Sequence, residues 1–252
     1  MTLDGAIVVA FLLCLVRTSA WIMTAPFMAG KSFPALAKLA VAISISLFSA
    51  PLVEAENVPT DILPFAGIAL GQVLVGLALG WVSGLFLHAF EIAGTMIDTS
   101  SGFSIATMFD PVSGTQTSIY ARFYNMLFLV LLFVTNAHLT LIGGFVRSFG
   151  AIPADEFPVL ALSGPAAIGA AVSQLMVAAL MIGAPVLGAL FLTEVALALA
   201  ARFAPQANIF VVGLPLKVMI SILAVGTALI LLPQHLPRLV EMGMYLAEDL
   251  FA

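Results

Sequence analysis

The chain has 252 residues, of which 62% are hydrophobic and 8% are charged, and its formal net charge is −5. Soluble proteins carry roughly 25% charged residues, so this composition excludes a water-soluble globular protein and indicates an integral membrane protein surrounded by lipid. The acidic balance and the singly scattered Lys and Arg residues exclude nucleic acid as a partner, and the single cysteine, Cys14, excludes an internal disulfide framework and a cysteine-based zinc site.

Six apolar stretches are candidates for membrane helices, which need about 20 residues each. We therefore expect an all-α, polytopic membrane protein of about six long helices with kinks, forming a single domain over residues 1–252. In chain order the stretches are Ile7–Phe27, Leu39–Val53, Ile62–Phe90, Phe123–Val146, Ala166–Ala201 and Leu216–Leu232.

The first stretch lacks the cationic segment of a signal peptide and begins with Asp4 instead. Its apolar run continues past Arg17 to Ala29, so we expect a membrane helix that is retained. Two lysines, at positions 31 and 38, follow this stretch, whereas three acidic residues between positions 54 and 61 follow the second. Because Lys and Arg gather on the cytoplasmic side, we expect the N-terminus outside, residues 100–122 and 202–217 inside, and the acidic loop at 155–156 outside.

The third stretch carries a glycine about every fourth residue, which places small residues on one helix face where another backbone can approach closely. The sequence leaves open whether that backbone belongs to the same chain or to another subunit. The fifth stretch would extend ~54 Å as one helix, and Pro185 predicts a kink within it. The glycines of the third stretch are Gly67, Gly71, Gly76, Gly80 and Gly84.

Ionisable residues within apolar stretches are candidates for function, because placing charge in a bilayer is costly. Glu194 is the deepest of them, and it fits either a carboxylate satisfied within the protein or the cation relay of a stand-alone secondary transporter. The residues of this kind are Arg17, His88, Glu91, His138 and Glu194.

Catalytic motifs are weak throughout. Ser101–Ser104 lacks the second glycine of a nucleophile elbow, and Asp98-Thr99-Ser100 has no second Asp-Thr-Ser or Asp-Thr-Gly unit with which to share a proton. The three histidines show no metal-ligand spacing, and neither phosphate-binding glycine loop is present. We therefore expect no enzyme, no cofactor and no metal site.

A polar segment at residues 98–122 reads DTSSGFSIATMFDPVSGTQTSIYAR and carries bulky apolar residues in its middle. One interpretation is a cytoplasmic loop with an amphipathic turn. The other is an apolar insert that closes a pore, because hydrophobic constrictions gate by dewetting. The bulky residues are Phe103, Ile105, Met108 and Phe109.

A second polar segment, ARFAPQANIFVVGLPLK at residues 201–217, separates the last two apolar stretches. We expect Pro205 and Pro215 to interrupt helical hydrogen bonding, and Gln206 and Asn208 to serve the backbone groups that such a break leaves unpaired. A plain connecting turn is the alternative.

Three motifs together resemble the FliR/SctT family of type III export-gate proteins. They are Gly102-Phe-Ser-Ile-Ala-Thr with Asp110-Pro111; His138-Leu-Thr-Leu-Ile leading to Ser148-Phe149 and Ile152-Pro153; and Arg202-x-x-Pro-Gln-x-Asn-x-Phe-x-x-Gly-x-Pro-x-Lys217. The likeness covers about residues 15–232. One departure is Ala137, where the family usually has glycine before the histidine.

The resemblance implies a non-enzymatic, all-α subunit of a flagellar export gate, which assembles as a helical, partly membrane-extruded ring. Its partners would be FliP-, FliQ- and FlhB-like subunits of the flagellar basal body in the bacterial inner membrane, and unfolded flagellar subunits would pass through it. A subunit of an injectisome export gate is the near alternative.

The resemblance also implies two functional segments. The first is a plug over the closed channel, sealed chiefly by Met108 and Phe109 and including Gly102, Phe103, Ile105, Asp110 and Pro111. The second is a partner-contacting turn that would dock the FlhB-like subunit, made of Arg202, Pro205, Gln206, Asn208, Phe210, Gly213, Pro215 and Lys217. His138 and Glu194 are the polar residues within the membrane whose roles stay open.

Overall fold

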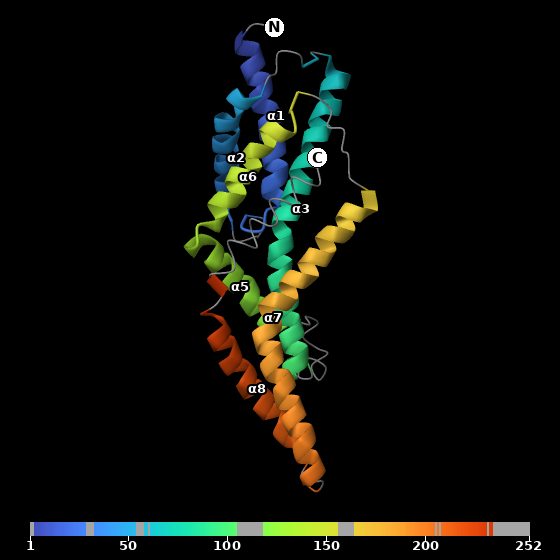
Figure 1. Ribbon diagram of the computed structural model, residues 1–252. Helices are drawn as coiled ribbons and strands as arrows, with labels where there is room; N and C mark the ends of the chain where they lie inside the picture. Colours follow the sequence, from blue (N-terminus) through green and yellow to red (C-terminus); the bar gives the residue numbers. More distant parts are fainter. Residues whose placement is uncertain are drawn as a thin grey trace, which may run out of the picture. The chain divides into compact units, whose positions relative to one another are not determined.

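The computed structural model describes residues 3–28, 33–53, 58–59, 61–104, 118–155, 164–204, 206, 208–230 and 232–233. Over these residues the chain forms seven α-helices and one short 3-10 helix, with no strand, which confirms the all-α prediction. In chain order they are α1 (Leu3–Thr24), α2 (Ala35–Ser49), η1 (Ala50–Leu52), α3 (Ile62–Ser101), α5 (Ile119–Val134), α6 (Ala137–Ala151), α7 (Gly164–Phe203) and α8 (Ile209–Ala228) (Figure 1).

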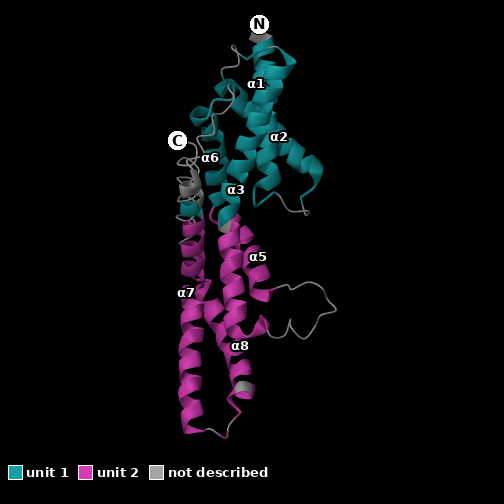
Figure 2. Cartoon of the chain, turned by 90° about the vertical axis from the view of Figure 1, so that its right-hand side faces the viewer, with its two compact units in different colours: residues 1–85, 136–171, 240–252 teal, residues 86–135, 172–239 magenta. Residues whose placement is uncertain are grey.

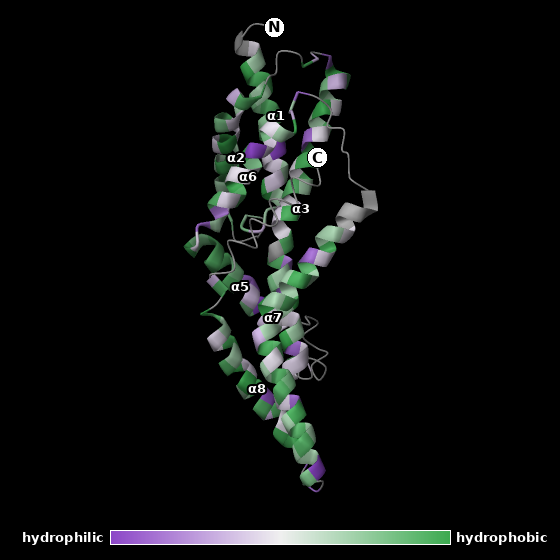
Figure 3. Ribbon diagram, viewed as in Figure 1, coloured by the Kyte–Doolittle hydropathy of each residue, from purple (hydrophilic) through white to green (hydrophobic). Residues whose placement is uncertain are grey.

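The helices have the length and composition of membrane-spanning segments. Five described spans are long and apolar enough to cross a bilayer, and α5 with α6 adds a sixth if that broken pair is one crossing. Hydrophobic residues run along every helix (Figure 3), and many large ones are exposed on the surface of the chain. The prediction of a polytopic membrane protein with about six long helices is thereby confirmed.

The fourth apolar stretch, expected as one helix, is two. The chain leaves α5 at Val134 and enters α6 at Ala137, and Asn136 between them has a φ of 57°. This is the left-handed region, which asparagine visits more readily than most residues because its short amide can hydrogen-bond locally. The break is therefore specified by one residue that a hydropathy pattern does not register.

The described helices belong to two compact units (Figure 2). Unit 1 comprises residues 1–85, 136–171 and 240–252, and unit 2 comprises residues 86–135 and 172–239. Helices α3 and α7 each run from one unit into the other, so neither unit is a continuous piece of chain. The expectation of a single domain over the whole chain stays a prediction.

Unit 1 is built where α1 meets α2, α3 and α6. Trp21 of α1 is fully buried and stacks on Phe145 of α6, with ring centroids 4.4 Å apart. The glycine face of α3 receives the backbone of α1, because a Cβ added at Gly76 would lie 2.8 Å from the Ala20 Cβ and one at Gly80 would lie 2.8 Å from the Trp21 carbonyl oxygen. At these two positions the close neighbour is therefore a helix of the same chain.

Unit 2 has an aromatic core between α3 and α5. Phe90 of α3 is fully buried, and its ring centroid lies 6.4 Å from that of Tyr124 and 5.2 Å from that of Phe128. The two helices cross closely at Gly94, where an added Cβ would lie 2.5 Å from the Ala121 Cα. This crossing places the last turn of α3 beside the first turn of α5.

Candidate functional site

The junction of α3 and α5 is held by a buried carboxylate. Asp98, in the last turn of α3, is 3% exposed. Its Oδ2 accepts hydrogen bonds from the Ser118 hydroxyl, from the Tyr120 backbone N–H at 2.9 Å and from the Ala121 backbone N–H at 3.4 Å. These donors belong to the start of α5, where backbone N–H groups lack partners within the helix and the helix dipole favours negative charge. Asp98 therefore caps α5 from a neighbouring helix.

The same junction reaches α8. The Tyr120 hydroxyl lies 2.8 Å from the hydroxyl of Ser221, a fully buried residue of α8. The Phe103 ring meets the Tyr120 ring edge-on with centroids 5.5 Å apart. Helix α3 gives way to Gly102, whose φ of 88° is a left-handed conformation that favours glycine at a helix C-terminus. The end of α3, the start of α5 and α8 thus form one polar and aromatic cluster.

The expected plug lies only partly within the described residues. Gly102 and Phe103 belong to the junction just described, and Phe103 is half-buried against Tyr120. The plug stays a prediction, because the remaining residues assigned to it lie outside the described residues: Ile105, Met108, Phe109, Asp110 and Pro111.

A cavity of about 450 Å³ opens beside this junction, between the end of α3 and the facing parts of α7 and α8. Polar groups from all three helices line it, together with apolar side chains such as Leu197. Gly213 of α8 permits the closeness of α7 and α8, since a Cβ there would lie 3.2 Å from the Leu197 Cδ1. The polar lining residues are Thr99, Ser100, Glu194 and Lys217.

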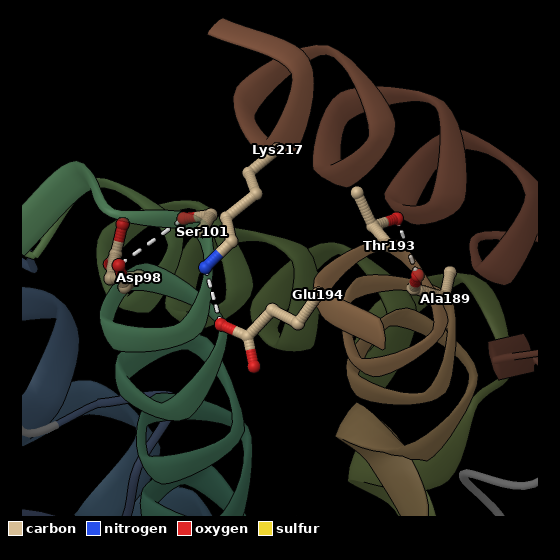
Figure 4. Close-up of polar contacts among 6 residues, drawn as sticks. All are labelled: Asp98, Ser101, Ala189, Thr193, Glu194 and Lys217. Atoms are coloured by element: carbon tan, nitrogen blue, oxygen red, sulfur yellow. Dashed lines mark hydrogen bonds and ion pairs between the residues drawn. The ribbon is translucent and has the colours of Figure 1, made fainter. Parts of the chain in front are cut away.

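An ion pair joins the two long helices across this cavity. The Lys217 ammonium of α8 contacts the Glu194 carboxylate of α7 (Figure 4). The Lys217 side chain is 21% exposed and that of Glu194 is 51% exposed, so the carboxylate reaches the cavity while the lysine stem is covered. Glu194 therefore has a counterion within its own unit. The sequence analysis did not predict this ion pair. The presence of one anion, Glu194, and one cation, Lys217, on successive apolar stretches could have suggested it.

The second predicted functional segment is much shorter than expected. The chain leaves α7 at Phe203 and enters α8 at Ile209, so Gly213, Pro215 and Lys217 are helical. The last apolar stretch was expected to begin at Leu216, after Pro215, but α8 begins at Ile209 and continues through Pro215. Proline has no backbone N–H, so Pro215 leaves one hydrogen bond of α8 unmade.

The remaining turn residues are divided between helix and connection. Arg202 lies in the last turn of α7. Asn208 is the residue before α8, and its backbone carbonyl accepts from Val211 at 3.1 Å, but its side chain makes no capping hydrogen bond. Gln206 is exposed. Phe210 is helical, and Pro205 lies outside the described residues.

Among the described residues, unit 1 contains a second buried charge, Arg17 of α1, which is fully buried. Its Nε donates to the Gln72 side chain at 2.6 Å, while Nη1 and Nη2 donate to the carbonyls of Ser148 and Ile152 at 3.2 and 2.8 Å. Its guanidinium also lies 4.4 Å from the Phe149 ring centroid. The carbonyls belong to the C-terminus of α6, which carries negative partial charge. Arg17, proposed above as a functional candidate, thus caps a helix.

The remaining ionisable candidates occupy different places. His138 lies in the first turn of α6 and is half-buried, and its role stays a prediction. His88 and Glu91 of α3 lie on the surface of unit 2 and face each other, with Nδ1 and Oε2 3.4 Å apart. In the part of the chain that the structure describes, no group of three or more His, Cys, Asp or Glu residues could hold a metal ion.

Comparison with known proteins places these features in a family. The model of the family described as "Bacterial export proteins, family 1" matches residues 8–243. The flagellar biosynthetic protein FliR of Bacillus subtilis (strain 168) is 33% identical over 214 residues, covering 84% of this chain and 83% of that one. FliR of Escherichia coli (strain K12) is 34% identical over 208 residues, covering 82% of this chain and 79% of that one.

A relative with a different name is less similar to this chain. The Yop proteins translocation protein T of Yersinia pestis is 27% identical over 179 residues, covering 70% of this chain and 69% of that one. The family match takes in both buried helix-capping charges, the α3–α5 junction and the ion pair of α7 and α8. With that match and that identity over most of its length, the chain belongs to family 1 of the bacterial export proteins.

Proposed function

We propose that this chain is a subunit of a flagellar type III protein export gate and resides in the bacterial inner membrane. The observation that carries the proposal is the family match over residues 8–243 together with two flagellar relatives at 33% and 34% identity. Its several apolar helices support residence in a membrane. The chain forms part of the channel for unfolded flagellar subunits, and it acts without catalysis.

The partners are FliP- and FliQ-like subunits, with an FlhB-like subunit around them in the flagellar basal body. Exposed apolar side chains support contact with other subunits or lipid, since Leu36 of α2 is 80% exposed and Phe203 of α7 is 85% exposed. The segment from Arg202 to Lys217 docks the FlhB-like subunit. Gln206 and Asn208, between α7 and α8, are exposed and available for such a contact.

The segment after α3 acts as the plug of the closed gate. Asp98 supports this role, because it joins the helix end before the segment to the helix start after it. Deleting residues 105–116 should leave the assembled gate permeable to small ions. An assembled gate with the deletion and unchanged ion permeability would contradict the plug.

A subunit of an injectisome gate is the second candidate, supported by the likeness to the Yersinia protein. The flagellar assignment is favoured because the Bacillus subtilis and Escherichia coli FliR proteins have higher identity than the Yersinia protein and match a larger share of the chain. A stand-alone transporter with Glu194 as relay is less well supported, since Glu194 is paired with Lys217.

Deletion of the gene tests the flagellar assignment. The deletion strain should lack filaments and should stop releasing flagellar subunits into the medium, and a plasmid copy should restore both. If the organism also carries an injectisome, its cargo should continue to be secreted. Loss of injectisome secretion with intact motility would reverse the assignment.

A further inference from the structure

One face of α3 in unit 2 is polar and exposed, in contrast to most of that unit's surface. The spacing of three, four and four residues places its members in one row along the helix. Elsewhere on unit 2, exposed side chains are largely apolar; Leu192 of α7 is 68% exposed and Val130 of α5 is 58% exposed. The members of the row are His88, Glu91, Thr95 and Thr99.

Groups of this row are satisfied within the helix itself. The His88 ring and the Glu91 carboxylate face each other, with side chains 54% and 49% exposed. The Thr95 hydroxyl donates to the Glu91 carbonyl at 2.9 Å, and the Thr99 hydroxyl donates to the Thr95 carbonyl at 2.9 Å. The row therefore presents polar surface while leaving little unmet hydrogen-bonding demand.

The row leads into the cavity of unit 2. Thr99 is both its last member and part of the cavity lining, where Ser100 and Gly102 continue the polar surface. The lining then reaches the Glu194–Lys217 ion pair. We call this continuous surface, from His88 through Thr99 to Lys217, the polar track; all of it lies within unit 2.

Three kinds of surroundings could meet the polar track: lipid, another subunit, or water. Lipid is unfavourable, because ionisable side chains in membrane helices face the protein interior or a water-filled cavity. A subunit bound through polar contacts would need free polar groups. The Glu194 carboxylate already contacts the Lys217 ammonium, the Glu91 carboxylate faces the His88 ring, and both threonine hydroxyls bond within α3. Water is the surrounding that matches exposed, polar and internally satisfied groups.

From this we infer that the polar track lines the aqueous path of the gate and is the surface along which an unfolded polypeptide moves. The inference rests on the proposed function, and it adds the residues that face the cargo. An unfolded chain offers backbone amides and varied side chains, all hydrated. Lys217 pairs with Glu194 and the threonine hydroxyls are satisfied within α3, so the track offers few free groups that would hold a passing segment tightly. Cargo of mixed sequence can therefore slide without being trapped.

Thiol labelling tests the inference, because the one native cysteine, Cys14, is fully buried. The variants are Thr95→Cys and Thr99→Cys on the track, with Leu192→Cys and Val130→Cys as controls that are also exposed in the isolated chain. Each is purified as the complex with its FliP- and FliQ-like partners. A charged, water-soluble thiol reagent should label the track variants about tenfold faster than the controls, since thiolates form and react in water.

Labelling of Thr95→Cys and Thr99→Cys at or below the control rate in an intact complex would overturn the inference. A photo-crosslinking residue at position 95 adds a second readout: it should attach to an export substrate stalled in the gate, whereas one at position 192 should not. Failure to form the complex at all would instead count against the proposed function. The two failures are therefore distinguishable.

Discussion

Two buried charges of opposite sign each complete the hydrogen bonding at one end of a helix. Asp98 accepts from the first N–H groups of α5, and Arg17 donates to the last carbonyls of α6. Both signs match the helix dipole, which is positive at the N-terminus and negative at the C-terminus. Helix capping therefore explains why these two ionisable side chains are buried. Their burial is no evidence that either of them takes part in transport.

Replacing Asp98 should weaken the α3–α5 junction. Asp98→Ala leaves the Ser118 hydroxyl and the Tyr120 backbone N–H without their acceptor, while the Ala121 N–H keeps its hydrogen bond to Ser118 Oγ at 3.2 Å. The free energy of unfolding should therefore fall by about 1–3 kcal/mol. Denaturant titration in detergent measures it. Thr99→Ala is the control, because the Thr99 hydroxyl bonds only within its own helix. Equal stability of the two variants would contradict the cap.

Arg17 should not tolerate replacement by lysine. A lysine keeps the charge but cannot reach Gln72 and two backbone carbonyls at once, because it lacks the planar fork of the guanidinium. We expect Arg17→Lys to lower the free energy of unfolding by about 2–3 kcal/mol. Arg122→Lys, on the exposed side of α5, should leave it nearly unchanged. An Arg17→Lys variant with an unchanged free energy of unfolding would show that the planar guanidinium is not needed at this position.

At the scale of helices, close packing between α1 and α3 depends on glycine at particular turns. Gly76 and Gly80 meet the α1 backbone, whereas Gly67 has open space where a Cβ would lie. The shared spacing predicts one glycine face, and the structure shows that only part of it is used within this chain. The open part is available to lipid or to another subunit.

Replacing glycine by alanine should therefore change the free energy of unfolding in different ways at two positions of α3. Gly80→Ala places a Cβ against Thr24 and 2.8 Å from the Trp21 carbonyl, so we expect a loss of about 1–3 kcal/mol in unfolding free energy. Gly67→Ala meets nothing and should be neutral or stabilise by up to about 1 kcal/mol through helix propensity. Thermal unfolding of both variants measures the difference, and a destabilised Gly67→Ala would mean that another subunit packs there.

Helix existence could be predicted from apolar composition, but several helix ends could not. The third stretch was expected to end at Phe90, where polar residues begin, yet α3 continues to Ser101, and the hydroxyls of Thr95 and Thr99 donate to carbonyls of the same helix. The fourth stretch was expected to be continuous, and a left-handed Asn136 divides it. Hydropathy reports the solvent of a segment, whereas these ends depend on individual hydrogen bonds and backbone angles.

Several residues of the candidate site could be predicted from the sequence, but most of the contacts between them could not. Glu194, Gly213 and Lys217 were all singled out, yet their meeting around one cavity depends on how α7 and α8 pack. Asp98 was noted only as part of a weak catalytic motif, and its capping role requires the crossing at Gly94. Long-range contacts of this kind leave no periodic signal in a single sequence.

At the scale of the whole molecule, the proposed export role depends on assembly with other subunits and does not call for a proton relay at Glu194. Glu194 is half exposed and paired, and pairs of this kind contribute only about 0–1 kcal/mol. We therefore expect Glu194→Gln to retain the amount of assembled gate and to slow swimming only partly, because it removes the counterion of Lys217 but no required proton relay. Swimming halos on soft agar and co-purification measure these. Abolished motility with an intact gate would instead favour a relay at this carboxylate.

The central claim, that this chain is one subunit of a multi-subunit export gate, is tested most directly by affinity purification of the tagged chain from its own membranes, followed by identification of whatever co-purifies. We predict a stable complex that contains FliP- and FliQ-like subunits. A chain that purifies alone from these membranes, and that moves a small solute when it is reconstituted alone into liposomes, would contradict the account.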